Sequence, residues 1–385
     1  MAHKDEIRRS GRDMTDRAEA AEKTPLEERL IDLIKLKGPI TVADYMADAL
    51  GHPHDGYYMN QTPIGADGDF TTAPEISQIF GELIGLWLVE AWRAMGSPND
   101  FNLIELGPGR GVLMEDILRA ARLRPEFIRG AHLWLLETSG RLRVEQQKRL
   151  RGSGLDPMWA DEFADIPPAP SLVVANEFFD CLPIHQYQRV ASGWRERFVG
   201  LNGDETKLDF VLGKTPPPAS LNLPAAAQSS EGDIVEISFA ARDFMGELCT
   251  LLTEHGGHAL IIDYGHMQSG LGETLQAVRA HKFWPPLASP GRADVTAHVD
   301  FEALGATAID HGAVAHGPVS QGQFLERLGL NIRAEMLSKG KTDDQAKAIR
   351  AGAYRIASPD QMGEIFKVMC VSGPAHPAPS GFEEI

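Results

Sequence analysis

The chain has 385 residues, 43% of them hydrophobic, which is typical of a soluble globular protein with a large core and more than one lobe. No apolar run is long enough to cross a bilayer, and the net charge of -17 argues against broad nucleic-acid binding, which needs a basic surface. The three cysteines are far apart, and neither they nor the histidines show metal-ligand spacing. We therefore expect reduced thiols, no metal and a cytoplasmic location.

The N-terminal part of the chain combines a charged segment, two helices and a long polar loop. Residues 1–23 are rich in charge and poor in large apolar side chains, which predicts a mobile tail. Thr24 and Pro25 open one helix, and Thr41 with Asp44 opens another. Residues 51–73 form a polar, glycine-rich stretch whose length indicates a functional loop. Pro74 begins a strongly apolar helix that continues to Trp92.

The most informative stretch follows the apolar run 101–104 and reads Ile104-Glu105-Leu106-Gly107-Pro108-Gly109-Arg110-Gly111. A helix-like run over 112–122 comes next. A strand, a glycine-rich turn and a helix in that order make a nucleotide-binding unit, because glycines let the backbone approach a ligand and the helix N-terminus offers free N–H groups.

The spacing of the glycines helps to identify the ligand. A dinucleotide fingerprint requires a small third residue, and here that register places Val112 there, which disfavours a dehydrogenase. The loop resembles motif I of S-adenosylmethionine-dependent methyltransferases, in which an acidic residue precedes the glycines as Glu105 does here. S-adenosylmethionine carries a sulfonium, an ammonium and a carboxylate instead of phosphates. The carboxylate of Glu105 suits the cationic groups, and the N–H groups of the turn suit the carboxylate. An ordinary tight turn is the alternative.

A second acid ends the next strand, over 131–137. Glu137 occupies the position where nucleotide-binding folds hold ribose hydroxyls. The alternative is that Glu137 favours the N-terminus of a helix that begins near Thr138 or Ser139.

The strand over 171–176 runs out into Asn176-Glu177-Phe178-Phe179-Asp180. The Asn176 carbonyl is suited to accept a hydrogen bond from a target amine, and the two phenylalanine rings could stabilise a methyl-bearing cation. Glu177 and Asp180 form a carboxylate pair that suits an arginine guanidinium and could accept the proton released after methyl transfer. The alternative is that Asn176 and Asp180 cap a turn while both phenylalanines belong to the core.

The remaining pattern indicates a core interrupted by insertions. Strands expected at 101–106, 131–137, 158–160, 171–176, 258–264 and 364–371 alternate with helices, which predicts a doubly wound, mostly parallel α/β sheet. Residues 184–212 alternate like paired strands, 273–330 contain strand-like runs with short loops, and 331–357 look helical. The expected division begins with a tail over 1–23 and a helical segment with a cofactor-covering loop over 24–96. The core is expected over 97–183, 234–272 and 358–385, the last of which includes the C-terminal tail. Two insertions interrupt it, a strand-rich insertion with a linker over 184–233 and a mixed insertion with a helical cap over 273–357.

With these motifs in view, the chain resembles the MidA-type methyltransferases, bacterial relatives of the mitochondrial complex I assembly-factor arginine methyltransferase. The resemblance covers nearly everything from about residue 25 to 372. It is carried by 105–111 and by Tyr57-Tyr58, Gly68-Asp69-Phe70-Thr71-Thr72-Ala73-Pro74-Glu75, Asn176-Glu177-Phe178-Phe179-Asp180-Cys181-Leu182-Pro183, Ile262-Asp263-Tyr264-Gly265 and residues 293–301.

The resemblance implies a class I, Rossmann-like methyltransferase with an additional lobe built from the N-terminal helices and the insertions. It implies S-adenosylmethionine as methyl donor, S-adenosylhomocysteine as product and, as partner, a complex I core subunit methylated on arginine. The segment 68–75 would close over the cofactor, and Asp161 and Glu162 follow the third strand, where adenine-contacting acids tend to lie. The expected catalytic residues are Asn176, Glu177 and Asp180. The expected cofactor contacts are Glu105, Gly107, Pro108, Gly109, Gly111, Glu137, Thr138, Asp161, Glu162 and Asn176, and the expected substrate or lid residues are Asp69, Phe70, Thr71, Thr72, Glu75, Phe178 and Phe179.

Two other functions fit the same motifs. A small-molecule N-methyltransferase would have a deep, closed pocket in place of an open acidic groove. A non-catalytic assembly chaperone would bind the methyl donor for stability without turnover. A dehydrogenase would require nicotinamide binding.

Overall fold

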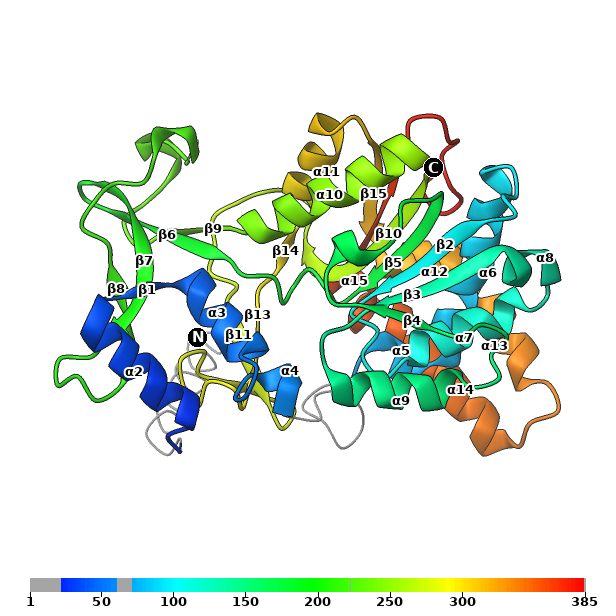
Figure 1. The fold of residues 1–385 in the computed structure, drawn as a ribbon, viewed down its shortest axis with the longest axis horizontal. Coiled ribbons are helices and arrows are strands. Elements are labelled where there is room, and N and C mark those ends of the chain that lie inside the picture. Colours follow the sequence, from blue (N-terminus) through cyan, green and yellow to red (C-terminus); the bar gives the residue numbers. More distant parts are fainter. Residues whose placement is uncertain (1–21, 61–70, 222, 384–385) are drawn as a thin grey trace. The chain divides into compact units, whose positions relative to one another are not determined.

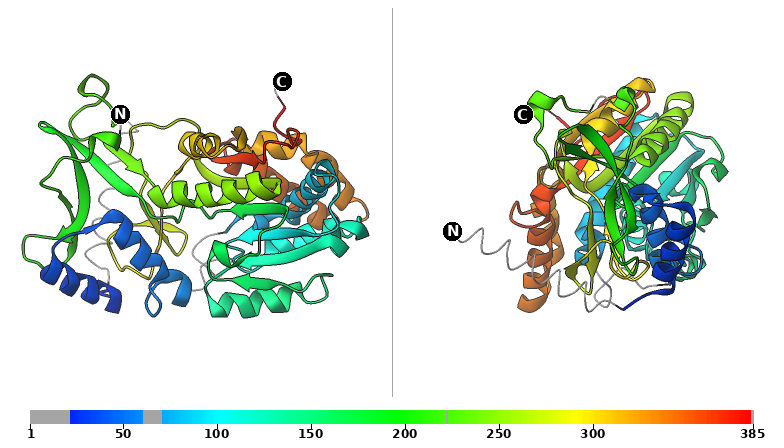
Figure 2. Two further views of the ribbon diagram at one scale, coloured as in Figure 1. Left: turned by 45° about the horizontal axis from the view of Figure 1, so that its top comes forward. Right: turned by 90° about the vertical axis from the view of Figure 1, so that its left-hand side faces the viewer.

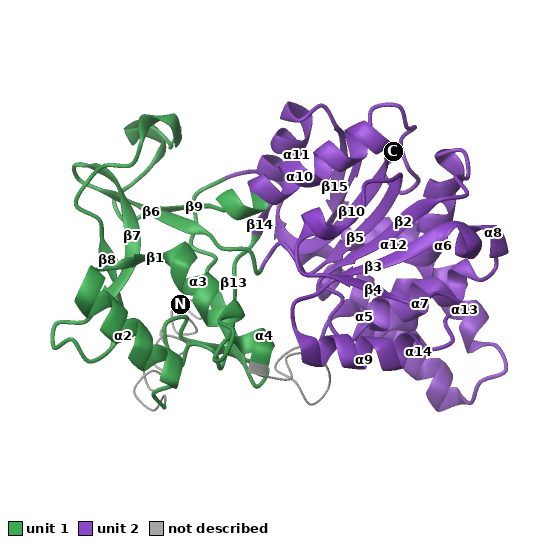
Figure 3. Cartoon of the chain, in the orientation of Figure 1, with its two compact units in different colours: residues 1–70, 181–241, 270–298 green, residues 71–180, 242–269, 299–385 purple. Residues whose placement is uncertain are grey.

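The computed structural model describes residues 22–60, 71–221 and 223–383, which form two compact units (Figure 3). Unit 1 contains 1–70, 181–241 and 270–298, and unit 2 contains 71–180, 242–269 and 299–385. Asp69, Phe70 and nearly all of the expected tail lie outside the described residues. Among the described residues, no helix is long and apolar enough to cross a membrane, and no group of three His, Cys, Asp or Glu side chains could hold a metal ion.

Unit 1 joins the N-terminal helices to the insertions. Its helices are α2 (Pro25–Lys37), α3 (Val42–Gly51) and α4 (Tyr57–Asn60). One sheet contains β1 (Ile40–Thr41), β6 (His185–Val190), β7 (Gly193–Leu201), β8 (Leu208–Leu212) and β9 (Ile234–Ile237), and a smaller one contains β11 (Gln276–Arg279), β12 (Lys282–Trp284) and β13 (Asp294–Thr296). The paired strands expected within 184–212 are confirmed, because β6 and β7 are antiparallel neighbours.

The helix starts predicted in unit 1 are confirmed by their caps. The Thr24 hydroxyl accepts a hydrogen bond from the Glu27 N–H at 3.1 Å. Thr41 and Asp44 form a reciprocal capping box at the start of α3. Apolar side chains of both helices, among them Leu26, Leu30 and Tyr45, then form the core of this unit with residues of its sheets.

Unit 2 is the α/β core (Figure 1). Its strands are β2 (Phe101–Leu106), β3 (Ala131–Leu136), β4 (Met158–Ala160), β5 (Ser171–Asn176), β10 (Gly257–His266), β14 (Val299–Asp300), β15 (Val314–Ser320) and β16 (Phe366–Ser372). Its helices are α5 (Ala73–Ile76), α6 (Gln78–Ala94), α7 (Val112–Ala121), α8 (Pro125–Gly130), α9 (Gly140–Leu150), α11 (Phe301–Asp310), α12 (Gln321–Arg327), α13 (Leu330–Ser338), α14 (Asp343–Ala357) and α15 (Met362–Ile365), and α10 (Phe239–His255) begins in unit 1 and continues here.

The sheet of unit 2 has the order β15-β16-β10-β5-β2-β3-β4. The pairs β10/β5, β5/β2, β2/β3 and β3/β4 are parallel, and β16 is antiparallel to both β10 and β15. β14 pairs with β10 in parallel, so seven strands run in one direction and β16 in the other, which confirms the mostly parallel α/β sheet.

Helices cover both faces of this sheet (Figure 2). Leu103 and Val174 belong to the core formed with α6 and α7. Ile104 and Val173 point to the opposite face, because side chains alternate along a strand, and they are buried as well. Strands buried on both faces explain the nearly continuous apolar runs of the sequence.

Two element predictions are wrong in detail. The apolar helix predicted from Pro74 is divided into α5 and α6 because Ser77 is extended (φ -152°, ψ 120°) and its side chain caps the second helix. The predicted strand-like region 273–330 contains two helices, α11 and α12. Phe301, Leu304 and Ala308 are buried at helical spacing behind the N-cap Asp300, a period that the strand interpretation overlooked.

Candidate active site

The chain reverses its direction across the sheet between β2 and β5. From β2 it continues to β3 and β4 on one side, and then returns to β5 and β10 on the other. Ligands of open α/β sheets bind at the carboxyl ends of the strands at such a point. The loops after β2 and β5 are 107–111 and 177–180, and together they carry eight of the nineteen predicted site residues. They touch each other, because a Cβ added to Gly107 would lie 3.1 Å from Cδ2 of Phe178.

The glycine turn has the backbone that its residue types permit. Gly107, Gly109 and Gly111 have φ values of 62°, 51° and 77°, in the left-handed region that costs glycine little. Gly111 is the N-cap of α7, and its N–H donates to the Pro108 carbonyl at 2.7 Å. A buried side chain that sequence reasoning missed, Gln146 of α9, donates to the Gly109 carbonyl at 2.7 Å.

Glu105 lies on β2 immediately before this turn and is 2% exposed. Its Oε2 has no hydrogen-bond partner among the described residues. Burial raises the pKa of Glu105 to about 8, because the charged form loses its hydration without compensation. A buried acid in this state is suited to a cationic ligand, and the ammonium group of S-adenosylmethionine supplies one.

Glu137 follows β3 directly. Its Oε1 accepts a hydrogen bond from the Ser139 N–H at 2.8 Å, and its Oε2 accepts from Gln146 Nε2 at 3.1 Å. Burial raises its pKa, and these two bonds oppose that rise. Ser139 is the N-cap of α9, so Glu137 supports this helix start, as the alternative interpretation proposed. Each carboxylate oxygen accepts two hydrogen bonds, so Glu137 retains capacity for ribose hydroxyls.

The other acids predicted to contact the cofactor are exposed. Asp161 and Glu162 follow β4, and Thr138 lies between Glu137 and the start of α9. Asp161 forms an ion pair with Arg143 at 2.7 Å, and the Glu162 N–H donates to Asp165 Oδ2 at 3.0 Å. Because β3 and β4 are parallel neighbours, both acids lie at the same edge of the sheet as Glu137.

The turn after β5 concentrates polar groups in little space. Glu177 has φ 52°, which is uncommon for a non-glycine residue and strained enough to indicate a functional position. Asn176 is 9% exposed, its Nδ2 donates to Glu177 Oε1 at 3.2 Å, and its Oδ1 has no hydrogen-bond partner among the described residues. The structure therefore offers a buried acceptor beside a carboxyl group, as the interpretation of Asn176 requires.

Glu177 and Asp180 lie on the same turn. Burial, together with the negative charge of Asp180, raises the pKa of Glu177 to about 8. The Glu177 carboxyl also accepts a hydrogen bond from the backbone N–H of Ala73, the first residue of α5. Asp180 Oδ2 accepts a hydrogen bond from the Tyr264 hydroxyl at 2.6 Å.

Asp263 is a central residue to which the sequence analysis assigned no role. It is completely buried on β10, and its Oδ2 accepts the backbone N–H groups of Phe178, Phe179 and Asp180 at 3.2, 2.9 and 3.2 Å. Burial and the charges of Asp180 and Glu177 raise its pKa well above the usual range, against the effect of these N–H bonds. An acid at the end of the apolar run 259–262 was the available signal.

The two phenylalanines of the turn form an aromatic cluster with Phe244 of α10. The Phe178 and Phe179 ring centroids lie 5.1 and 5.9 Å from that of Phe244. Phe179 is 3% exposed and contributes to the core, as the alternative interpretation proposed, whereas Phe178 is partly exposed beside the glycine turn.

The described part of the predicted lid joins the two loops. Thr71 and Thr72 precede α5, and Glu75 lies on it. Glu75 Oε1 lies 3.6 Å from Nη1 of Arg110 in the glycine turn. The backbone N–H of Ala73, the first residue of α5, donates a hydrogen bond to the Glu177 carboxyl in the turn after β5. Helix α5 therefore contacts both sides of the proposed cofactor site.

Known proteins resemble this chain over most of its length. The model of a family described as S-adenosyl-L-methionine-dependent methyltransferases matches residues 83–319. The mitochondrial protein arginine methyltransferase NDUFAF7 of Xenopus tropicalis is 38% identical over 373 residues, which cover 90% of this chain and 85% of the frog protein. The human NDUFAF7 is 37% identical over 369 residues, which cover 89% of this chain and 82% of the human protein.

A solved protein from Burkholderia thailandensis, with S-adenosyl-homocysteine bound, superposes with a TM-score of 0.81 at 26% identity, covering 97% of this chain and 96% of its own. The orphaned oxygens of Glu105 and Asn176 and the left-handed glycine turn fit that class of ligand. The resemblance, the fold class and the cofactor predicted from the sequence are thus confirmed. The chain belongs to this family of S-adenosylmethionine-dependent methyltransferases, and S-adenosylmethionine is its methyl donor.

Proposed function

We propose that this enzyme methylates an arginine side chain of a protein, and that the protein is a core subunit of respiratory complex I acted on during assembly. The observation that carries the proposal is the carboxyl pair Glu177 and Asp180 beside the unpartnered Oδ1 of Asn176 at the cofactor edge of the sheet. The names of the curated relatives, protein arginine methyltransferases, support the same substrate class.

A guanidinium group fits these side chains. It stays charged and donates paired hydrogen bonds to carboxylates, and two carboxyl groups on one turn neutralise it and hold it in one orientation. Asn176 Oδ1 accepts a further N–H from the substrate. A fixed orientation matters because it converts an encounter into a reaction within one complex.

The acids also account for the proton that must leave. S-adenosylmethionine supplies the methyl group as an electrophile, and its sulfur keeps the electron pair of the broken bond. The nitrogen that attacks the methyl carbon loses one proton, so that the methylated guanidinium again carries a single positive charge. Glu177, with a pKa of about 8 in the free site, is matched to receiving a proton near neutral pH.

The remaining features agree with a protein substrate. A net charge of -17 favours a basic polypeptide over a nucleic acid. We assign the enzyme to the cytoplasm of its cell, where a bacterial complex I subunit would be met during assembly, whereas the curated relatives are mitochondrial by name.

The test uses the full chain, S-adenosylmethionine with a labelled methyl group and purified complex I core subunits, with methylarginine identified by mass spectrometry. Glu177→Gln should lower kcat/KM roughly 10- to 150-fold, because a charge-assisted hydrogen bond of about 1.5–3 kcal/mol is lost while the amide oxygen still accepts the Ala73 N–H. Glu335→Gln, an exposed acid on α13, is the matched control and should behave like the native chain.

Three outcomes would contradict the proposal in different ways. Label on a small molecule but not on arginine would favour a small-molecule N-methyltransferase. Cofactor binding without any turnover, with complex assembly unchanged in Glu177→Gln, would favour a chaperone. Equal rates for Glu177→Gln and Glu335→Gln would remove Glu177 from the catalytic centre.

A further inference from the structure

Two consecutive residues of β10, Asp263 and Tyr264, contact the turn over 177–180, which we call the acidic turn. Asp263 accepts three successive N–H groups of residues 178–180, and Tyr264 donates its hydroxyl to Asp180. We propose that Tyr264 is a positioning residue of the catalytic centre, which holds the Asp180 carboxyl in place and favours its charged form, on the turn whose backbone Asp263 fixes. The proposal rests on the function proposed above and names a residue beyond it.

The backbone around Tyr264 is paired with three other strands. Ile262 pairs with Asn176 of β5, Tyr264 pairs with Phe366 of β16, and Gly265 pairs with Val299 of β14. A Cβ added to Gly265 would lie 2.1 Å from the Val299 carbonyl oxygen, so this close approach of β10 and β14 requires glycine. The end of β10 is therefore a rigid support.

The side chain of Tyr264 is held as well. Its ring packs edge-on against the Phe366 ring, with 5.5 Å between the centroids. The hydroxyl lies 2.6 Å from Asp180 Oδ2 and donates to it, and a hydrogen bond donated to a carboxylate stabilises its charged form. The geometry therefore favours a negative charge on Asp180.

The charge on Asp180 matters because several acids lie close together around the acidic turn. Glu177 from the same turn, and Asp263 and Tyr264 from β10, face Asp180. Neighbouring carboxyl groups cannot all ionise easily, so a proton is shared among them. A donor aimed at Asp180 leaves that acid as the charged anchor for the substrate cation, while Glu177 retains its proton until the cation arrives.

Tyr264→Phe tests the proposal because it removes a single oxygen from a packed ring. We expect kcat/KM at pH 7 to fall roughly tenfold, the size expected for one hydrogen bond to a charged group, and the acidic limb of its pH profile to move to higher pH. Melting should change little. The other Asp263 oxygen, Oδ1, accepts the Tyr264 N–H at 3.0 Å, so Asp263→Asn would place an amide N–H against a backbone N–H in either orientation. It is expected to melt lower and serves only as a comparison.

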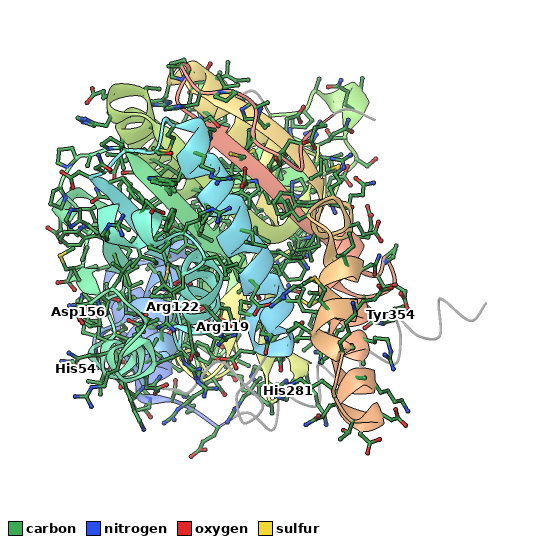
Figure 4. All side chains as sticks on the ribbon, turned by 90° about the vertical axis from the view of Figure 1, so that its right-hand side faces the viewer. His54, Arg119, Arg122, Asp156, His281 and Tyr354 are labelled. Carbon is green, nitrogen blue, oxygen red and sulfur yellow. The ribbon has the colours of Figure 1, made fainter. Side chains whose placement is uncertain are left out.

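Tyr354→Phe is the matched control (Figure 4). Tyr354 lies on the surface helix α14, and its hydroxyl is 2.9 Å from both carboxylate oxygens of Asp360. It repeats the tyrosine–aspartate bond away from the acidic turn. Its removal should leave kcat/KM and the pH profile unchanged.

A second measurement separates this inference from the arginine proposal. Carbon-13 labelling of aspartate carboxyl groups, with Asp180→Asn for assignment, follows Asp180 by nuclear magnetic resonance without turnover. Its titration midpoint should rise in Tyr264→Phe. A raised midpoint with no arginine methylation in the native chain would remove the arginine proposal and leave the positioning role intact. An unchanged midpoint, or an unchanged pH profile in a chain that methylates arginine, would overturn the positioning role.

Discussion

Replacing Glu105 with glutamine should weaken S-adenosylhomocysteine binding and remove a proton that the native site releases. Glu105 is buried, its Oε2 has no partner among the described residues, and burial raises its pKa from 4.5 to about 8. At pH 7 such an acid carries about nine-tenths of a proton. Pairing with the ligand ammonium requires the charged form, so binding near pH 7 should release close to one proton.

The magnitude follows from the same burial. Each pKa unit is worth about 1.4 kcal/mol, so the difference between 4.5 and about 8 corresponds to roughly 5 kcal/mol of disfavoured charge in the free site. Glutamine keeps the shape and removes the charge. Losing a charge-assisted hydrogen bond of about 1.5–3 kcal/mol should raise Kd roughly 10- to 150-fold.

Glu105→Gln should raise the stability of the fold at higher pH, although it weakens ligand binding. The unfolded chain loses the Glu105 proton near pH 4.5, whereas the folded chain keeps it until about pH 8. The native fold therefore loses stability relative to Glu105→Gln as pH rises through this window, and the difference is constant above it. Urea unfolding at pH 5 and pH 9 measures the effect.

Isothermal titration in two buffers of different ionisation enthalpy counts the released protons. Glu177→Gln is the control, because its acid lies on the substrate side and should leave the count near its native value. Affinity of Glu105→Gln within twofold of the native chain would refute the reasoning, and so would a native binding heat that does not depend on the buffer.

The remaining predictions concern the glycine turn, its support and the pH profile. Gly109→Val should abolish S-adenosylhomocysteine binding in calorimetry, because a branched residue is strained at φ 51°, whereas Gly140→Ala, where a Cβ would meet nothing within 4 Å, should bind normally. Gln146→Leu should lower the free energy of unfolding by about 1–3 kcal/mol and weaken cofactor binding, because it leaves the Gly109 carbonyl and the Trp159 indole N–H without their partner. An unchanged midpoint of urea denaturation would contradict this prediction. Activity should rise with pH up to about 8 as Glu177 ionises more readily, and the profile of Glu177→Gln should lack the part of this limb near pH 8; an identical rise near pH 8 in both proteins would assign it to another group.

Much of the fold was predictable from the chain because the signals are local. Buried parallel strands appear as apolar runs, caps mark the starts of α2 and α3, and three glycines at alternate positions require a turn with positive φ. The family motifs place the candidate site residues on the loops after strands. Each of these signals depends on a few consecutive residues, so that a single sequence suffices to read it.

Only the tertiary structure decided which of these segments are neighbours. Asp263 lies 85 positions from Phe178 along the chain, yet it binds the N–H groups of that turn because β10 pairs with β5. Gln146 supports the Gly109 carbonyl across 37 positions because α9 packs beside the glycine turn. The division of the predicted helix at Ser77 lets α5 reach Glu177. The charge on the acids likewise depends on burial and on neighbours distant in sequence, because the cost of an ion is set by everything that surrounds it.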